Sequence, residues 1–136
     1  MAVTANSIIT PQTPKSGMAA CTTANTTYTA SPTNTQPLIA AGVNGARVTR
    51  IAAIPLETVA DTQLQLFRDG DGTGTSKRFF NAAKMLAYTM ATGTAPAVTD
   101  FGYSDDSPLI LAAGEKVYAA IAISKNISFN AEWADY

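Results

Sequence analysis

Short segments in which apolar and polar residues alternate recur along the chain, separated by turns rich in glycine and proline. The clearest is residues 61–69, where Leu64 and Leu66 alternate with Gln63 and Gln65. A period of two places the leucines on one face of a strand and the amides on the opposite, exposed face. The glycine-dense turn DGDGTG and the segment TSKRFF follow, so the pattern predicts a β-hairpin.

The C-terminal part of the chain shows two further strand patterns. In residues 116–124 both faces of the expected strand are apolar, which predicts a central or doubly covered strand. In residues 127–135, Ile127, Phe129 and Trp133 share one face, and polar residues occupy the other. We therefore expect Trp133 to pack in the core.

Four shorter segments are also typical of strands: 18–24, 38–41, 46–54 and 109–111. Residues 81–90 fit either one or two helical turns or a strand, because their alanine, methionine and leucine residues favour helix. About eight strands in a body of this length predict an all-β fold, a jelly roll or a related Greek-key β-sandwich.

The first residues differ from the body. Residues 1–17 contain Pro11 and Pro14 among small polar residues, and they predict an extended N-terminal arm. In a lone chain we expect this arm to fray, and the alternative is that it lies extended against a neighbour. Residues 18–136 are expected to form a single domain. Residues 91–108 are predicted to be a long loop, a kind of segment that is usually functional or contact-making.

Composition narrows the choice of partners. Only 14% of the residues are charged and the net charge is −1, so no basic field exists that would attract a phosphate backbone. No signal peptide or apolar run long enough to span a membrane is evident. The one cysteine, Cys21, lies among small residues and is expected to be buried. We expect no nucleic-acid, membrane or small-molecule partner.

The chain contains no histidine, which excludes a serine triad, a histidine general base and zinc sites built on histidine. Asp69 and Asp71 resemble the start of a calcium-binding loop, but Thr73 and Phe80 stand where further ligands would be required. We interpret this segment as a glycine turn capped by its own aspartates, with a weak cation site as the alternative. No catalytic residue, cofactor or metal site is predicted, and we do not expect an enzyme.

Longer stretches of the sequence are similar to one family. The segments AVTANSIITPQTPK, GARVTRIAAIPLETVADTQLQLFRDG, TDFGYSDDSPLILAAGEKVYAAIAIS and FNAEWADY cover nearly the whole chain. They resemble the capsid cement, or decoration, proteins of tailed phages, with the nearest likeness to that of short-tailed Bordetella phages.

This resemblance implies a function. It implies a jelly-roll homodimer, with a trimer as the alternative, on the outer surface of a phage capsid assembled in the bacterial cytoplasm. There it would bind the major capsid protein, clamp neighbouring subunits and stabilise the mature head without catalysis. The candidate contact residues come from the arm and the long loop. They are Ile8, Ile9, Pro11, Pro14, Phe101 and Tyr103.

An alternative interpretation is a carbohydrate-binding β-sandwich module of a phage fibre or another surface structure. Such a module presents exposed aromatic rings that stack on sugars, and the candidates are Tyr103, Trp133 and Tyr136. A third interpretation, a small hydrolase, requires a pair of carboxylates in a pocket with perturbed pKa values.

Overall fold

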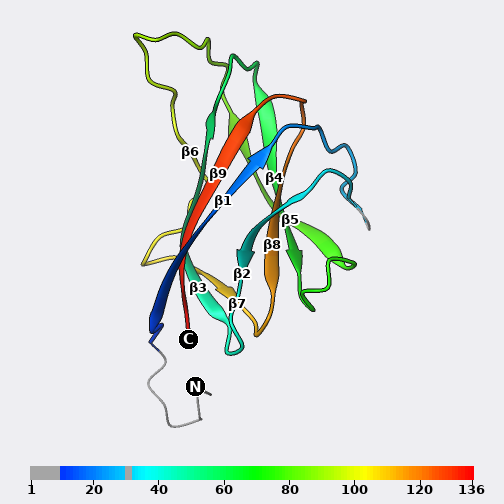
Figure 1. The fold of residues 1–136 in the computed structure, drawn as a ribbon, viewed down its shortest axis with the longest axis vertical. Coiled ribbons are helices and arrows are strands. Elements are labelled where there is room, and N and C mark those ends of the chain that lie inside the picture. The colour runs from blue at the N-terminus through cyan, green and yellow to red at the C-terminus, as the bar shows by residue number, and fades with distance from the viewer. Residues whose placement is uncertain (1–9, 30–31) are drawn as a thin grey trace.

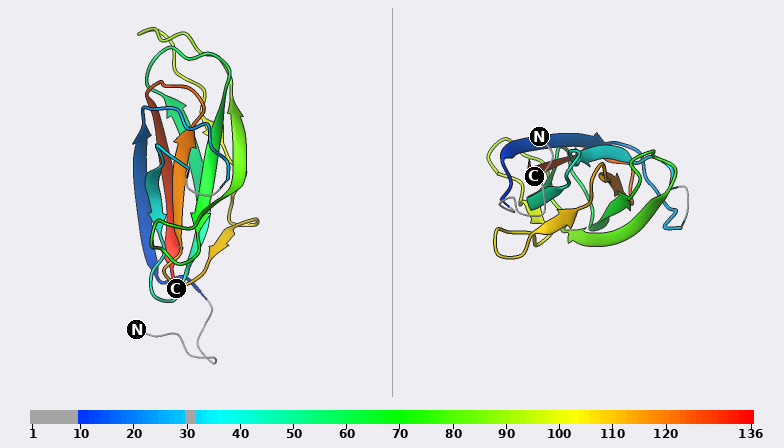
Figure 2. Two further views of the ribbon diagram at one scale, coloured as in Figure 1. Left: turned by 90° about the vertical axis from the view of Figure 1, so that its right-hand side faces the viewer. Right: turned by 90° about the horizontal axis from the view of Figure 1, so that it is seen from below.

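The chain folds as an all-β sandwich, as the alternating pattern predicts. Residues 10–29 and 32–136 are described by the computed structural model. Within them nine strands form two antiparallel sheets, whose strands follow the long axis of the molecule (Figures 1 and 2). The strands are β1 Thr13–Cys21, β2 Gln36–Ala40, β3 Ala46–Pro55, β4 Thr62–Asp69, β5 Lys77–Met85, β6 Thr99–Asp100, β7 Leu109–Leu111, β8 Lys116–Ile121 and β9 Ile127–Asp135.

The two sheets interleave distant parts of the chain. The five-stranded sheet has the order β1-β9-β3-β6, and β7 also pairs with β3. The four-stranded sheet has the order β2-β8-β4-β5. Strands from the two ends of the sequence therefore lie side by side, and β1 pairs with β9 along its whole length, from Thr13 opposite Asp135 to Cys21 opposite Ile127.

Several strand bounds differ from the sequence prediction. β1 begins at Thr13, so residues 13–17 of the expected arm are strand residues. β5 continues to Met85, which resolves the ambiguous segment 81–90 as strand over its first half. The predicted long loop contains the two-residue strand β6. In each case the segment pairs with another strand of its sheet. Local sequence preference carries no information about such pairing.

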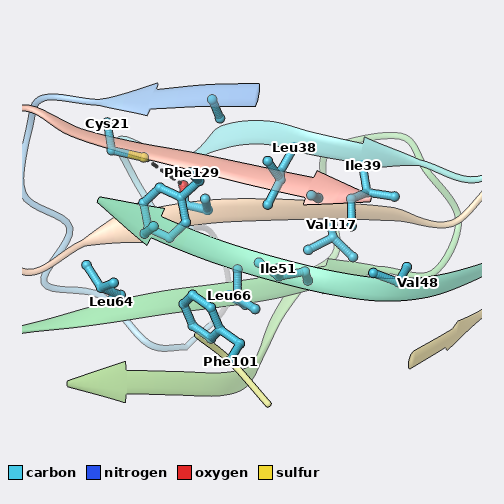
Figure 3. Packing of buried hydrophobic residues seen from close by; sticks show 14 of the residues in the cluster. Cys21, Leu38, Ile39, Val48, Ile51, Leu64, Leu66, Phe101, Val117 and Phe129 are labelled. Atoms are coloured by element: carbon cyan, nitrogen blue, oxygen red, sulfur yellow. Dashed lines mark hydrogen bonds between the residues drawn. The ribbon is translucent and has the colours of Figure 1, made fainter. Parts of the chain in front are cut away.

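The core lies between the two sheets and contains the residues that alternation placed inward (Figure 3). Leu64 and Leu66 of β4 are fully buried, as are Phe129 of β9 and Ile51 of β3. Burying a side chain of this size contributes roughly 1.5–3 kcal/mol. Cys21 is buried among them as expected, and burial raises the pKa of its thiol to about 12, so the thiol stays protonated at neutral pH.

One glycine permits close contact between the two sheets. A Cβ atom at Gly17 would lie 2.3 Å from the carbonyl oxygen of Leu38 and 3.0 Å from the ring of Trp133. Trp133 is buried, as predicted, with 8% of its surface exposed. The absent side chain at Gly17 therefore allows β1 to approach β2 while the indole fills the space between the sheets.

One prediction about the sheet faces is wrong. Gln65 was expected on an exposed face, but it is fully buried, together with its neighbours Phe67, Tyr118 and Ala120 on the outer face of the four-stranded sheet. The connection between β1 and β2, which we call the covering loop, packs over this face; its described residues are 22–29 and 32–35. Alternation identified the correct face of β4 but carried no information about what covers it.

Asn25 attaches the covering loop to the sheet. Its amide nitrogen donates to Oε1 of Gln65 at 2.9 Å and to the carbonyl oxygen of Thr27 at 3.0 Å. Its amide oxygen accepts from the backbone N–H of Thr33 at 3.1 Å, and its own N–H donates to the carbonyl of Ile121 at 2.7 Å. Asn25 and Gln65 are both fully buried, and the bond between their side chains is the one that satisfies Oε1 of Gln65.

The substitution Asn25→Ala tests this attachment. We expect it to lower the free energy of unfolding by about 2 kcal/mol, because Oε1 of Gln65 would be left buried without its hydrogen-bond donor and the covering loop would lose the bonds of the Asn25 side chain. Urea unfolding followed by the fluorescence of Trp133 measures the change. Asn130→Ala, at an exposed position of β9, is the matched control and should stay within about 0.5 kcal/mol of the parent. Equal losses in the two variants would contradict the role of Asn25.

Candidate protein-binding surface

The outer face of the five-stranded sheet is accessible, in contrast to that of the four-stranded sheet. Pairing of β1, β9 and β3 arranges its outward residues in rows, one of which contains Met18 and Asn130 and another Ala20, Ser128 and Ile54. We call this surface the open face. Its exposed or half-buried residues are Pro14, Ser16, Met18 and Ala20 of β1, Arg47, Thr49, Arg50 and Ile54 of β3, and Ser128, Asn130, Glu132 and Ala134 of β9.

The charged groups of the open face lie on β3 and β9, and its β1 residues are all uncharged. Among its residues only Arg47, Arg50 and Glu132 carry a charge, and Arg50 lies 4.0 Å from Asp100. Met18 is 76% exposed and is the most exposed large apolar side chain of this face. Charged residues are depleted at the centre of protein interfaces, and methionine is enriched there. The surface is therefore suited to contact with another protein.

A hollow of about 490 Å³ lies at the end of the open face where β1 begins. Pro11 and Pro14 line it together with Arg47, Thr49 and Glu132. The structure thus brings these two predicted contact residues next to the open face. The side chain of Arg47 donates a hydrogen bond to the backbone carbonyl of Asp105, which holds the loop after β6 at the margin of this hollow.

The other predicted contact residues lie elsewhere. Ile8 and Ile9 are outside the described residues. Phe101 is buried in the core, with its ring centroid 6.1 Å from that of Phe129. Tyr103 is half-buried, packs against the core and accepts a hydrogen bond at its hydroxyl from Asn81 at 2.9 Å. Neither aromatic ring belongs to the open face.

Met18 was not selected from the sequence, although a signal for it exists. Cys21 is expected to face inward, and strict alternation then places Ala19 inward and both Met18 and Ala20 outward. The observed burial of β1 follows this order. The large exposed side chain could therefore have been found by extending the alternation backwards from the cysteine.

The aspartates of the glycine turn are bound to the turn itself. Asp71 Oδ1 accepts from the backbone N–H of Thr73 at 3.0 Å and from its hydroxyl at 2.7 Å. Asp69 is buried and accepts a hydrogen bond from the backbone N–H of Gly74. The bond from the Thr73 backbone, followed by that from its hydroxyl, lowers the pKa of Asp71. These contacts confirm the interpretation of the segment as a self-capped turn.

A further buried carboxylate, that of Glu115, connects β4 with the turn between β7 and β8. Glu115 accepts from Arg68 at both oxygens, with distances of 2.7 and 3.0 Å, and from the backbone N–H of Ala112 at 3.0 Å. Arg68 also donates to the carbonyl of Ile110 at 3.1 Å. Burial alone would raise the pKa of Glu115, but the bonds from Arg68 and Ala112 outweigh it and hold that pKa below its usual value.

Neither a metal site nor a membrane-spanning helix is found in the part of the chain that the structure describes. Residues 10–29 and 32–136 contain no group of three or more cysteine, aspartate or glutamate side chains placed to hold a metal ion. In the same residues there is no helix of sufficient length and apolarity to cross a lipid bilayer. Comparison of the chain with protein-family models, curated proteins and solved structures finds no match.

Acid unfolding of Glu115→Gln tests the ion pair. Because the pKa of Glu115 is lowered from 4.5 in the folded chain, its ionised form contributes stability above about pH 4.5 that is lost as the pH falls through the folded pKa. We expect the variant to be about 2 kcal/mol less stable than the parent at pH 7. We also expect it to lose less stability between pH 7 and pH 3.

Urea unfolding of both proteins at the two pH values measures this difference. The control is Glu132→Gln, which changes an exposed carboxylate on β9 and should retain the parent's sensitivity to acid. Identical acid sensitivity in Glu115→Gln and the parent would show that Glu115 does not contribute to it.

Proposed function

We propose that this protein is a non-enzymatic capsid cement protein of a tailed phage. In this role it binds the outer surface of the head, contacts neighbouring copies of the major capsid protein and stabilises the mature shell. The observation that carries the proposal is the open face, an accessible sheet surface with an exposed methionine on its edge strand β1. The resemblance of the four quoted segments to phage cement proteins implies the same function.

The strand order supports a jelly roll as the particular form of the sandwich. The chain pairs β1 with β9, β2 with β8, β3 with both β6 and β7, and β4 with β5. This is the pairing of one long antiparallel hairpin that has been rolled so that successive pairs alternate between the two sheets. In this description β6 and β7 together act as one interrupted strand beside β3.

A cement protein of this kind stabilises the shell because its binding is thermodynamically coupled to shell assembly. A molecule that binds only the assembled shell lowers the free energy of that state, and every occupied junction adds its own contribution. A standard protein interface buries about 800 Å² on each partner, which is comparable to one face of a small sandwich. We propose a homodimer as the binding unit, because two linked faces can contact two neighbouring capsid subunits at once.

The roles of the buried carboxylates support a structural rather than a catalytic function. Asp69 binds its own turn, Glu115 binds Arg68 and a loop N–H, and Asp135 binds Lys15 at 2.7 Å and the backbone N–H of Gly42 at 3.1 Å. Each of these groups bonds to the chain through at least one oxygen, and Oδ1 of Asp69 is buried with no hydrogen-bond partner among the described residues. In a catalytic site, by contrast, a titratable group would be directed at a substrate.

Reconstitution of the shell tests the proposal. Purified protein is added to heads that lack it, and the bound amount is measured by co-sedimentation. We expect saturable binding of the parent and binding weaker by about tenfold or more for Met18→Glu, because a carboxylate would have to lose its hydration at the contact. Heads carrying the parent protein should also retain their DNA to higher temperature.

The matched control is Leu86→Glu, which introduces the same charge at another large side chain, 64% exposed, beyond the end of β5. It should bind like the parent. A parent protein that does not bind heads would overturn the cement function. Equal binding by the parent and Met18→Glu would overturn only the assignment of the open face.

A further inference from the structure

A second surface feature lies on the opposite side of the sandwich. A hollow of about 490 Å³ is formed where the covering loop meets the start of β5. The side chains that matter are two aromatic rings and a set of polar groups. They are Tyr28, Thr75, Ser76, Lys77, Arg78 and Phe79.

The two aromatic rings form a fixed platform. Tyr28 and Phe79 meet edge to face, with ring centroids 5.2 Å apart and an angle of 82° between the planes. Phe79 packs in turn on the fully buried Phe67 at 5.6 Å, and the hydroxyl of Tyr28 donates to Gln63 at 2.7 Å. Both rings are nevertheless open to solvent, 47% for Tyr28 and 37% for Phe79. Aromatic surface is thus held in place without being covered.

The polar groups lie at the rim of this platform. Lys77 is already engaged, since its ammonium group donates to Thr35 at 2.8 Å and lies 4.3 Å from the ring centroid of Tyr118. Arg78 is exposed, and within residues 10–29 and 32–136 its guanidinium makes no ion pair. Thr75 and Ser76 complete the lining, and the hydroxyl of Thr75 is also bonded to that of Thr73 at 2.7 Å. A guanidinium in this position is suited to bind a carboxylate or phosphate through two parallel hydrogen bonds.

We propose that this hollow binds a saccharide that carries an acidic group. The apolar face of a sugar ring packs on Tyr28 and Phe79, its hydroxyls bond to Thr75 and Ser76, and its acidic group pairs with Arg78. The volume lies within the range of small-molecule sites, which combine apolar walls with a few placed polar groups. A protein partner would require a much larger contact area than this hollow offers.

The site is compatible with binding to a shell and does not depend on it. The hollow belongs to the outer side of the four-stranded sheet, whereas the open face is the outer side of the other sheet. A molecule attached through its open face would therefore leave the hollow accessible. Saccharide binding can be measured on the isolated full-length protein, so its outcome is separate from that of the reconstitution with heads.

The test is a titration of the isotopically labelled full-length protein followed by backbone amide NMR. The probes are glucuronic acid, glucose as its neutral counterpart, and acetate as the acid without the ring. We expect saturable shifts for Tyr28 and residues 75–79 with glucuronic acid, and roughly tenfold weaker binding with each of the other two. Saturation by acetate as tight as by glucuronic acid, or no saturable shift at these amides, would overturn the proposal.

Two substitutions separate the contributions of ring and charge. Phe79→Ala should weaken binding of both sugars roughly tenfold, because it removes half of the platform. Arg78→Gln, at an exposed position, should abolish the preference for glucuronic acid over glucose while leaving glucose binding unchanged. Leu86→Ala, which shortens an exposed side chain away from the hollow, should bind like the parent. A preference for the acid that survives Arg78→Gln would contradict the assigned role of the guanidinium.

Discussion

The buried amide pair of Asn25 and Gln65 determines which surfaces of this sandwich are available to other molecules. A glutamine at the centre of a sheet can be buried only if another group satisfies its amide, and Asn25 does so at 2.9 Å. The same contact fixes the covering loop over Phe67 and Tyr118, so the outer face of one sheet becomes a second small core. Within residues 10–29 and 32–136 the other sheet has no equivalent of this pair, and its outward residues on β1 and β9 are exposed or half-buried.

The elements that the sequence predicted best are those in which one face packs on the central core. β9 shows this clearly, because its burial alternates strictly and its large apolar residues point inward. The prediction failed for Gln65 since alternation reports which residues share a face and is silent about long-range contacts. The loop that buries this residue comes from 40 positions earlier in the chain, through Asn25. A lone polar residue in a loop gives no local sign of such a contact.

The candidate surface could be predicted only in part for a related reason. Low charge and the absence of histidine favoured a binding function, and Pro11 and Pro14 do lie beside the open face. Phe101 was selected as a candidate contact residue of the long loop, yet β6 pairs with β3 just before it and directs its ring to Phe129. Composition indicated a protein-binding surface. Which side chains belong to that surface depends on strand pairing, as the pairing of β6 with β3 shows for Phe101.

The covering loop gives the two faces different physical characters. On the open face β1 exposes uncharged residues, among them Met18, and contact with a partner there gains from excluding water over a wide area. Around the hollow the exposed groups are two rings and an uncompensated guanidinium, which favour a small polar ligand with an apolar side. Because the loop that contributes Tyr28 is the one that Asn25 attaches, the hollow exists only while the outer face of the four-stranded sheet is covered. One buried hydrogen-bonded pair thus separates a surface suited to a large partner from a site suited to a small one.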